Sequence, residues 1–147
     1  MFNQVISANA IDIDAPAERV WDILIDVANY AEWNPFTPGV ETSFEVGSPV
    51  LLHVRLGPLK LRQREWIQAV EPPSLVAWDS TMGARLLLHT HRDQRLAALG
   101  ERSCRYETSI AFSGVLAPVV VLLCGRAIRS GFNSVAQALK QHAEAGQ

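Results

Sequence analysis

The sequence predicts an α+β fold in which a curved antiparallel sheet closes on one long C-terminal helix. Several central segments alternate apolar and polar residues with the period of a half-buried strand, and turns containing Gly or Pro separate them. The last part of the chain instead repeats apolar residues at helical spacing. A length of 147 residues fits one domain, 1–147, that buries its own core.

The N-terminal part predicts one strand followed by two short helices. Isoleucines that alternate with aspartates indicate a strand over Val5–Asp14. Pro16 suits the first turn of a helix, and the apolar spacing after it continues to about Ile25. A second short helix is expected over Val27–Trp33. It ends ahead of Pro35, because a residue that precedes proline avoids the helical region.

The middle of the chain predicts a series of hairpins, and the last strand, 102–113, alternates most cleanly. The expected strands are Val40–Val46, Val50–Leu56, Leu59–Val70, Leu75–Thr81, Ala84–Leu96 and Arg102–Ser113. From about Pro118 to Glu144 an apolar stripe predicts the long helix. Because a long curved sheet cannot close fully on one helix, we expect a mostly apolar cavity between them, which suits a small ligand.

Composition excludes several classes of function. Thirteen Lys and Arg against fifteen Asp and Glu give a net charge of −2, so no basic excess favours nucleic acid. Two cysteines are too few for a disulfide framework, and the N-terminus lacks the pattern of a secretory signal, so we expect a cytoplasmic protein. His89 and His91 have no third ligand at a familiar spacing, so no metal is predicted. No motif for a cofactor is present either.

Three blocks of sequence resemble the START-like (SRPBCC) superfamily: IDAPAERVWDIL at 13–24, YAEWNPF at 30–36, and FSGVLAP at 112–118 with the helix that follows. Within it, the chain is similar to the polyketide cyclase/dehydrase and lipid-transport group of bacterial proteins. The resemblance implies a helix-grip fold, in which about seven strands wrap around the last helix. It places the cavity between the sheet, that helix and the two short helices. Members differ in ligand and in whether they catalyse a reaction.

The aromatic candidates for ligand contact are Tyr30, Trp33 and Phe36, which the resemblance places at the cavity mouth. There they would form a gate and a stacking surface for a flat ligand. The alternative is a packing role at the corner between the short helices, which we favour for Trp33. On the apolar stripe of the long helix, further candidates are Gly125, Ile128 and Phe132. Gly125 would leave room for a ligand or for a closely packed strand.

The polar candidates lie on strands. Gln63 and Glu65 share a face with leucines, so Glu65 would orient a ligand hydroxyl or move a proton. Alternatively, Glu65 pairs with an arginine, or a bulge reverses the face. Tyr106 and Thr108 offer hydroxyls from the last strand, unless these bond the backbone or water. His91 would act as a hydrogen-bond partner or a general base only if it points inward, and the alternation leaves its face open.

Three functions compete. The first is the binding or carriage of a small hydrophobic ligand such as a lipid, quinone, polyketide-like or aromatic compound. The second is a cyclase or dehydrase acting on a carbonyl compound, with Glu65 or His91 as base and Tyr106 as donor. We favour binding, because the sequence shows no converging acid and base.

The third function is a protein-interaction module. The run Val119–Cys124 is apolar on every side and would meet a dimer partner, a membrane or the domain's own loops. Membrane contact ranks lowest, since few basic residues come before Arg126. The chain is expected to be a monomer or a homodimer.

Overall fold

The computed structural model of the protein describes residues 4–145. Its elements run in the order β1 (Gln4–Ser7), β2 (Ile11–Ile13), α1 (Ala17–Ile25), η1 (Val27–Glu32), β3 (Gly39–Glu41), β4 (Pro49–Leu56), β5 (Leu59–Glu71), β6 (Leu75–Met82), β7 (Leu88–Gly100), β8 (Ser103–Ser113) and α2 (Ala117–Ala145). The predicted α+β class is confirmed, with the short helices early in the chain and the long helix last.

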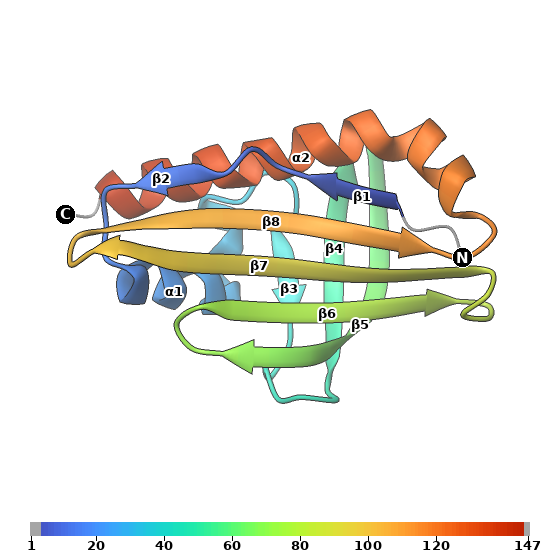
Figure 1. Ribbon diagram of the computed structural model, residues 1–147, viewed down its shortest axis with the longest axis horizontal. Coiled ribbons are helices and arrows are strands. Elements are labelled where there is room, and N and C mark those ends of the chain that lie inside the picture. The colour runs from blue at the N-terminus through green and yellow to red at the C-terminus, as the bar shows by residue number, and fades with distance from the viewer. Residues whose placement is uncertain (1–3, 146–147) are drawn as a thin grey trace.

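One antiparallel sheet has the order β1-β8-β7-β6-β5-β4-β3, and β2 also pairs with β8. In Figure 1 the sheet curls so strongly that β4 runs across the direction of β7 and β8, while α2 lies along β8. This wrapping of a sheet around the last helix is the helix-grip arrangement that the resemblance implies. It leaves the inner sheet face opposite α2, which is where the cavity lies.

The core divides into one large cluster and two small ones. The large cluster joins α1 and the C-terminal half of α2 to the sheet, with Val20, Leu24, Tyr106 and Leu139 almost fully buried. The two small clusters lie along the N-terminal half of α2 and are built around Phe112 and around Phe36 with Phe132, respectively. These small clusters border the cavity, so the C-terminal half of α2 anchors the fold and the N-terminal half faces the ligand site.

Three of the predicted strands have wrong bounds. The strand expected over Val5–Asp14 is two strands, because the Asn9 N–H leaves the sheet to donate to Asn133 Oδ1 (3.0 Å) on α2. The strand expected over Val40–Val46 ends at Glu41, and Phe44 takes a positive φ of 61° in the turn that follows. The strand expected over Ala84–Leu96 begins only at Leu88, since residues 84–87 form a turn, and it continues past the expected end to Gly100.

Candidate functional site

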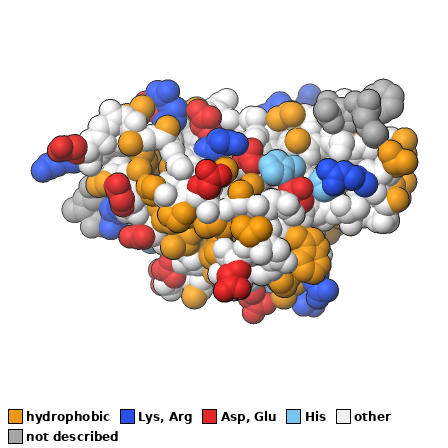
Figure 2. Space-filling model, turned by 60° about the horizontal axis from the view of Figure 1, so that its bottom comes forward, with side chains coloured by type: hydrophobic (Ala, Val, Ile, Leu, Met, Phe, Trp, Pro, Cys, Tyr) orange, Lys and Arg blue, Asp and Glu red, His pale blue; other side chains and the backbone are white. Residues whose placement is uncertain are grey.

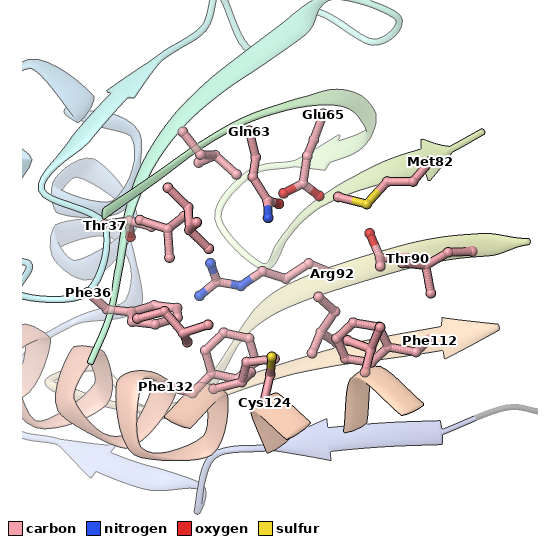
Figure 3. Close-up of a pocket in the computed structure, with 18 residues that line it drawn as sticks. Phe36, Thr37, Gln63, Glu65, Met82, Thr90, Arg92, Phe112, Cys124 and Phe132 are labelled. Atoms are coloured by element: carbon pink, nitrogen blue, oxygen red, sulfur yellow. The ribbon is translucent and has the colours of Figure 1, made fainter. Parts of the chain in front are cut away.

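A cavity of about 280 Å³ lies between the inner face of the sheet and the N-terminal half of α2 (Figure 3). Aliphatic side chains from β4 form one wall, α2 forms the opposite wall, and Phe36 closes one side. The volume is slightly below the range of roughly 300–1,000 Å³ that is common for small-molecule sites. The cavity therefore suits one small, mostly apolar compound.

The α2 wall follows from residue spacing. Val120, Cys124, Ile128 and Phe132 recur at every fourth position, which places them on one side of the helix. Gly125 lies off this line: a Cβ there would meet Val121 and Ile6 at ordinary contact distances. Of the three contacts predicted on this helix, Ile128 and Phe132 line the cavity, whereas Gly125 sits beside the cavity wall without forming part of it.

Phe36 is held in the wall from two sides. The Asn34 side-chain oxygen accepts hydrogen bonds from the N–H groups of Phe36 (3.1 Å) and Thr37 (2.8 Å), which is the turn geometry that Asn favours. The Phe36 ring meets Phe132 edge to face at 5.7 Å. A Cβ at position 131 would come within 2.2 Å of this ring, so Gly131 is required for the ring's position.

The polar part of the cavity comes from neighbouring regions of the sheet. Gln63 and Glu65 alternate inward from β5, and Thr90 and Arg92 alternate inward from β7. Figure 3 shows Glu65 and Arg92 extending into the same space. One edge of the cavity is therefore polar, and the opposite edge, formed by α2, is apolar apart from the Cys124 thiol.

Arg92 is buried without a carboxylate partner. It is 6% exposed, and among residues 4–145 no carboxylate lies within ion-pair distance of its guanidinium. Its Nε and Nη2 atoms each lie 3.4 Å from Thr108 Oγ1, which is long for a hydrogen bond. The guanidinium stands 4.4 Å from the Phe132 ring centroid. Cation–π contact thus replaces part of the lost hydration. The Tyr106 hydroxyl also interacts with the guanidinium.

Glu65 is the second buried ionisable group of the cavity. It is 5% exposed, and its Oε1 atom has no hydrogen-bond partner among the described residues. Burial raises the pKa of Glu65 to about 7; the charge of Arg92 opposes this rise, and that of Asp79 adds to it. Near neutral pH both protonation states are populated, so this carboxyl can donate or accept a proton.

Five of the eleven predicted ligand contacts line the cavity, namely Phe36, Gln63, Glu65, Ile128 and Phe132. The aromatic residues Tyr30 and Trp33 do not. Tyr30 is buried and donates its hydroxyl hydrogen to the Leu24 carbonyl, and Trp33 stacks on His142 at 6.1 Å. Both pack the corner between the short helices and α2, which is the alternative role considered for this cluster.

Tyr106 and Thr108 point to the predicted face of β8 but lie outside the cavity. The Tyr106 hydroxyl donates to Gln94 Oε1 (2.6 Å) inside the large core cluster. The Thr108 hydroxyl donates to the Asp93 carbonyl (3.0 Å) and lies behind the Arg92 guanidinium. Both hydroxyls are satisfied within the protein. Thr108 bonds the backbone, as the alternative interpretation expects, whereas Tyr106 bonds a side chain.

His91 lies on the outer face of the sheet and away from the cavity. Its Nδ1 contacts an Asp79 oxygen and its Nε2 lies 2.7 Å from Asp93 Oδ1. Asp79 also bonds His89 Nε2 (3.1 Å). We call these four side chains the outer cluster. The sequence left this face open, and the structure places Arg92 inward in place of His91. Within residues 4–145, no group of three or more His, Cys, Asp or Glu side chains, the outer cluster included, is arranged so that it could hold a metal ion.

Arg92 is the polar cavity residue that the sequence interpretation missed. The sequence does contain an indication of this, because Arg92 lies on the same face of the strand as Leu88 and Leu96, which are both buried. The alternation does not show which face is buried, because three consecutive leucines at 86–88 make both faces of the expected strand apolar. Thr37, Thr90 and Cys124 were missed as well, and no motif marks them.

Solved structures of low sequence identity share the fold. An aromatase/cyclase from a Streptomyces species has 22% identity and a TM-score of 0.69, covering 97% of this chain and 94% of that chain. A START superfamily protein from Mycobacterium smegmatis has 18% identity and a TM-score of 0.73, covering 97% and 99%. Norcoclaurine synthase from Thalictrum flavum, in complex with dopamine and hydroxybenzaldehyde, has 16% identity and a TM-score of 0.73, covering 99% and 89%.

No curated protein matches the sequence significantly. The family described as polyketide cyclase / dehydrase and lipid transport matches residues 4–144. This match and the apolar cavity confirm the expectation of a small hydrophobic ligand held inside the protein. The chain belongs to the polyketide cyclase / dehydrase and lipid transport family.

Proposed function

We propose that the cavity carries an apolar small molecule with one oxygen acceptor, a carboxylate or a carbonyl oxygen, that accepts hydrogen bonds from Arg92. The supporting observation is the buried Arg92 guanidinium without a carboxylate partner. A buried charge left unpaired is strongly unfavourable, so a partner from outside the chain is the simplest compensation. Guanidinium groups bind carboxylates through two parallel hydrogen bonds, which also fixes the orientation of the ligand.

The surroundings of Arg92 favour an acceptor over a donor. Glu65 is not within ion-pair distance, and its raised pKa leaves part of the population neutral at pH 7. The cavity therefore carries more positive than negative charge. The apolar walls supply the rest of the binding free energy, at about 25 cal/mol per Å² of buried apolar surface before association costs.

A binding experiment with matched probes tests this proposal. We would measure the affinity for decanoate against decanol and for 2-naphthoate against 2-naphthol by isothermal titration calorimetry. A charged hydrogen bond contributes about 1.5–3 kcal/mol, so the wild type should prefer each carboxylate by roughly 10-fold or more. Comparison of the straight-chain pair with the aromatic pair then reports the ligand shape that the cavity prefers.

Substitution Arg92→Met should abolish the preference for carboxylates and leave the binding of the neutral probes nearly unchanged. The matched control is Arg95→Met, which removes an exposed arginine of β7 that pairs with Asp93. If Arg92→Met retains the carboxylate preference, or if the wild type shows none, the role proposed for Arg92 is wrong.

Catalysis is a second candidate, and Glu65 is the observation that favours it. A carboxyl with a pKa of about 7 that faces a carbonyl held by Arg92 has the acid–base character that cyclisation or dehydration needs. Two of the structurally similar proteins are an aromatase/cyclase and a norcoclaurine synthase. If this candidate is correct, Glu65→Gln should bind the probes as the wild type does while losing turnover of a β-keto substrate.

A further inference from the structure

An apolar surface covers the end of the molecule where β6, β7 and α2 meet. We call it the apolar end, and its most exposed members are Leu86, Val115, Val119, Leu122 and Leu123. Leu122 and Leu123 are 83% and 77% exposed. The Val115 N–H donates to the Leu86 carbonyl (2.9 Å), so the β6–β7 turn and the start of α2 form one surface. Figure 2 shows hydrophobic side chains at the right edge, where this end of the molecule lies.

The described part of the chain does not cover this surface. By length and composition, α2 qualifies as a candidate membrane span, yet only 22% of its most apolar window is buried within the structure. Its inner side packs on the sheet, so the helix forms part of the fold while its outer side remains exposed. Further along the helix the outer side is polar, with Asn133, Gln137 and Lys140. The exposed leucines are therefore specific to the N-terminal half.

The exposed charged side chains on the segments that form the apolar end are all arginines. Arg126 and Arg129 are exposed and follow Val119 and Leu122 along one stripe of α2. Arg85 is exposed in the turn that packs on the start of α2. The sequence has no Asp or Glu from 80 to 92 or from 108 to 143, although the whole chain has a net charge of −2. The fold thus brings Arg85 to this surface, which the sequence order alone does not show.

The apolar end is continuous with the cavity. Cavity-lining Leu88, Val120 and Cys124 directly follow Leu87, Val119 and Leu123 in the chain, and Met82 at the end of β6 also lines the cavity. Exposed leucines with flanking arginines match a bilayer surface that contains anionic lipids. A two-fold contact between copies would instead bring the same arginines of both chains close together, which is unfavourable.

We propose that the apolar end docks on the surface of a membrane that contains anionic lipids. Leu122 and Leu123 insert at the level of the headgroups, and Arg85, Arg126 and Arg129 bind lipid phosphates. An apolar ligand would then pass between the bilayer and the cavity with little exposure to water. This inference goes beyond the proposed function and does not depend on the role of Arg92.

Co-sedimentation of the full chain with vesicles tests this inference. The protein should bind vesicles of phosphatidylcholine mixed with phosphatidylserine, and much less those of phosphatidylcholine alone. Leu122→Glu should reduce vesicle binding about 10-fold or more. The double substitution Arg126→Gln and Arg129→Gln should reduce it by about fivefold for each arginine removed. The matched control is Leu99→Glu, which places the same change on an exposed leucine of β7 at the opposite end and should leave binding unchanged (Figure 1).

Three results would overturn membrane docking: no binding to the anionic vesicles, an equal loss with Leu99→Glu, or a wild-type dimer that Leu122→Glu converts to a monomer without vesicle binding. The last result would assign the surface to a second copy of the chain. Affinity of Leu122→Glu for decanoate in solution should stay at the wild-type value. This readout separates a failure of docking from a failure of the proposed ligand site, and it also shows that the variant is folded.

Discussion

On the outer face of the sheet, His89 and His91 share the carboxylate of Asp79. The other ring nitrogen of His91 is paired with Asp93, and that of His89 with the Thr81 hydroxyl. One position further along β7, on the inner face, Arg92 has no carboxylate partner within the described residues. The two faces of one strand therefore carry polar groups in opposite states. The outer groups are hydrogen-bonded by their neighbours, whereas the inner Arg92 has no carboxylate beside it, and Glu65 Oε1 on β5, in the same cavity, has no hydrogen-bond partner among the described residues.

This difference separates polar groups that hold the fold from polar groups that are available to a ligand. Two buried side-chain atoms of residues 4–145 lack a hydrogen-bond partner, Glu65 Oε1 and Trp78 Nε1. The Trp78 ring lies 5.7 Å from the Arg92 guanidinium, and Glu65 lines the same cavity. Unsatisfied buried groups lower stability, so an orphaned carboxyl oxygen in the cavity wall, such as that of Glu65, is expected where function requires it.

The largest expected effect is a gain of stability from Glu65→Gln. Between 4.5 and about 7, the folded state binds more protons at Glu65 than the unfolded state does, because burial raises the pKa. The wild type therefore loses stability as pH rises through this range, whereas the variant does not. The shift corresponds to roughly 3 kcal/mol, so Glu65→Gln should be more stable by this order above pH 7 and equal below about pH 4.5.

Urea denaturation across this pH range measures the difference. Glu41→Gln, which changes an exposed carboxylate of β3, is the matched control and should show no such trend. A difference between Glu65→Gln and the wild type that is independent of pH would mean that Glu65 titrates as an exposed carboxyl. The inner face would then resemble the outer one.

Asp79→Ala should lower the stability of the protein, in contrast to Glu65→Gln. It leaves His89, which is 7% exposed, without the acceptor for its Nε2 hydrogen bond. An unsatisfied buried partner costs about 1–3 kcal/mol, and chemical denaturation at neutral pH should show this loss. Asp93→Ala is the comparison within the same cluster: it removes contacts to His91 and Arg95, which are more exposed, and should cost less than about 1 kcal/mol. Equal losses would show that burial does not govern the outer cluster.

The sequence predicted the faces of the elements better than their positions along the cavity. Alternation correctly pointed Gln63 and Glu65 inward, and helical spacing correctly selected Ile128 and Phe132. Tyr106 was assigned to the correct face as well, yet it lies beneath α1 and the C-terminal half of α2. Periodicity determines which side of a strand faces inward; it does not determine which part of that side is filled by core residues and which part is left open.

Tertiary contacts explain the remaining differences. Residues 84–87 have an apolar pattern that is compatible with a strand, but the carbonyls of Leu86 and Leu87 accept hydrogen bonds from Val115 and Leu116, just before α2. This contact holds residues 84–87 in a turn, so β7 begins at Leu88. From there, every second residue, Arg92 included, points inward. The partner residues are about thirty positions away in the sequence, so no local pattern predicts the turn.

The smallest expected effect is at His91, and it tests whether charge contributes to the outer cluster. Burial alone would lower the pKa of His91, but the hydrogen bond to Asp79 and the charges of Asp79 and Asp93 raise it above 6.5. Protonated His91 therefore adds stability that is fully present below pH 6.5 and is lost as pH rises through the raised pKa. The side chain is 41% exposed, so the expected contribution is below about 1 kcal/mol.

His91→Gln should accordingly cost more stability at about pH 6 than at about pH 9, and denaturation at both values measures this. NMR titration of the His91 ring in the wild type should give a midpoint above 6.5. An equal cost at both pH values would mean that hydrogen bonds, and not charge, hold the outer cluster. In that case the two faces of β7 would differ only in how many hydrogen bonds are satisfied, and the unpaired charge of Arg92 would remain the feature that distinguishes the inner face.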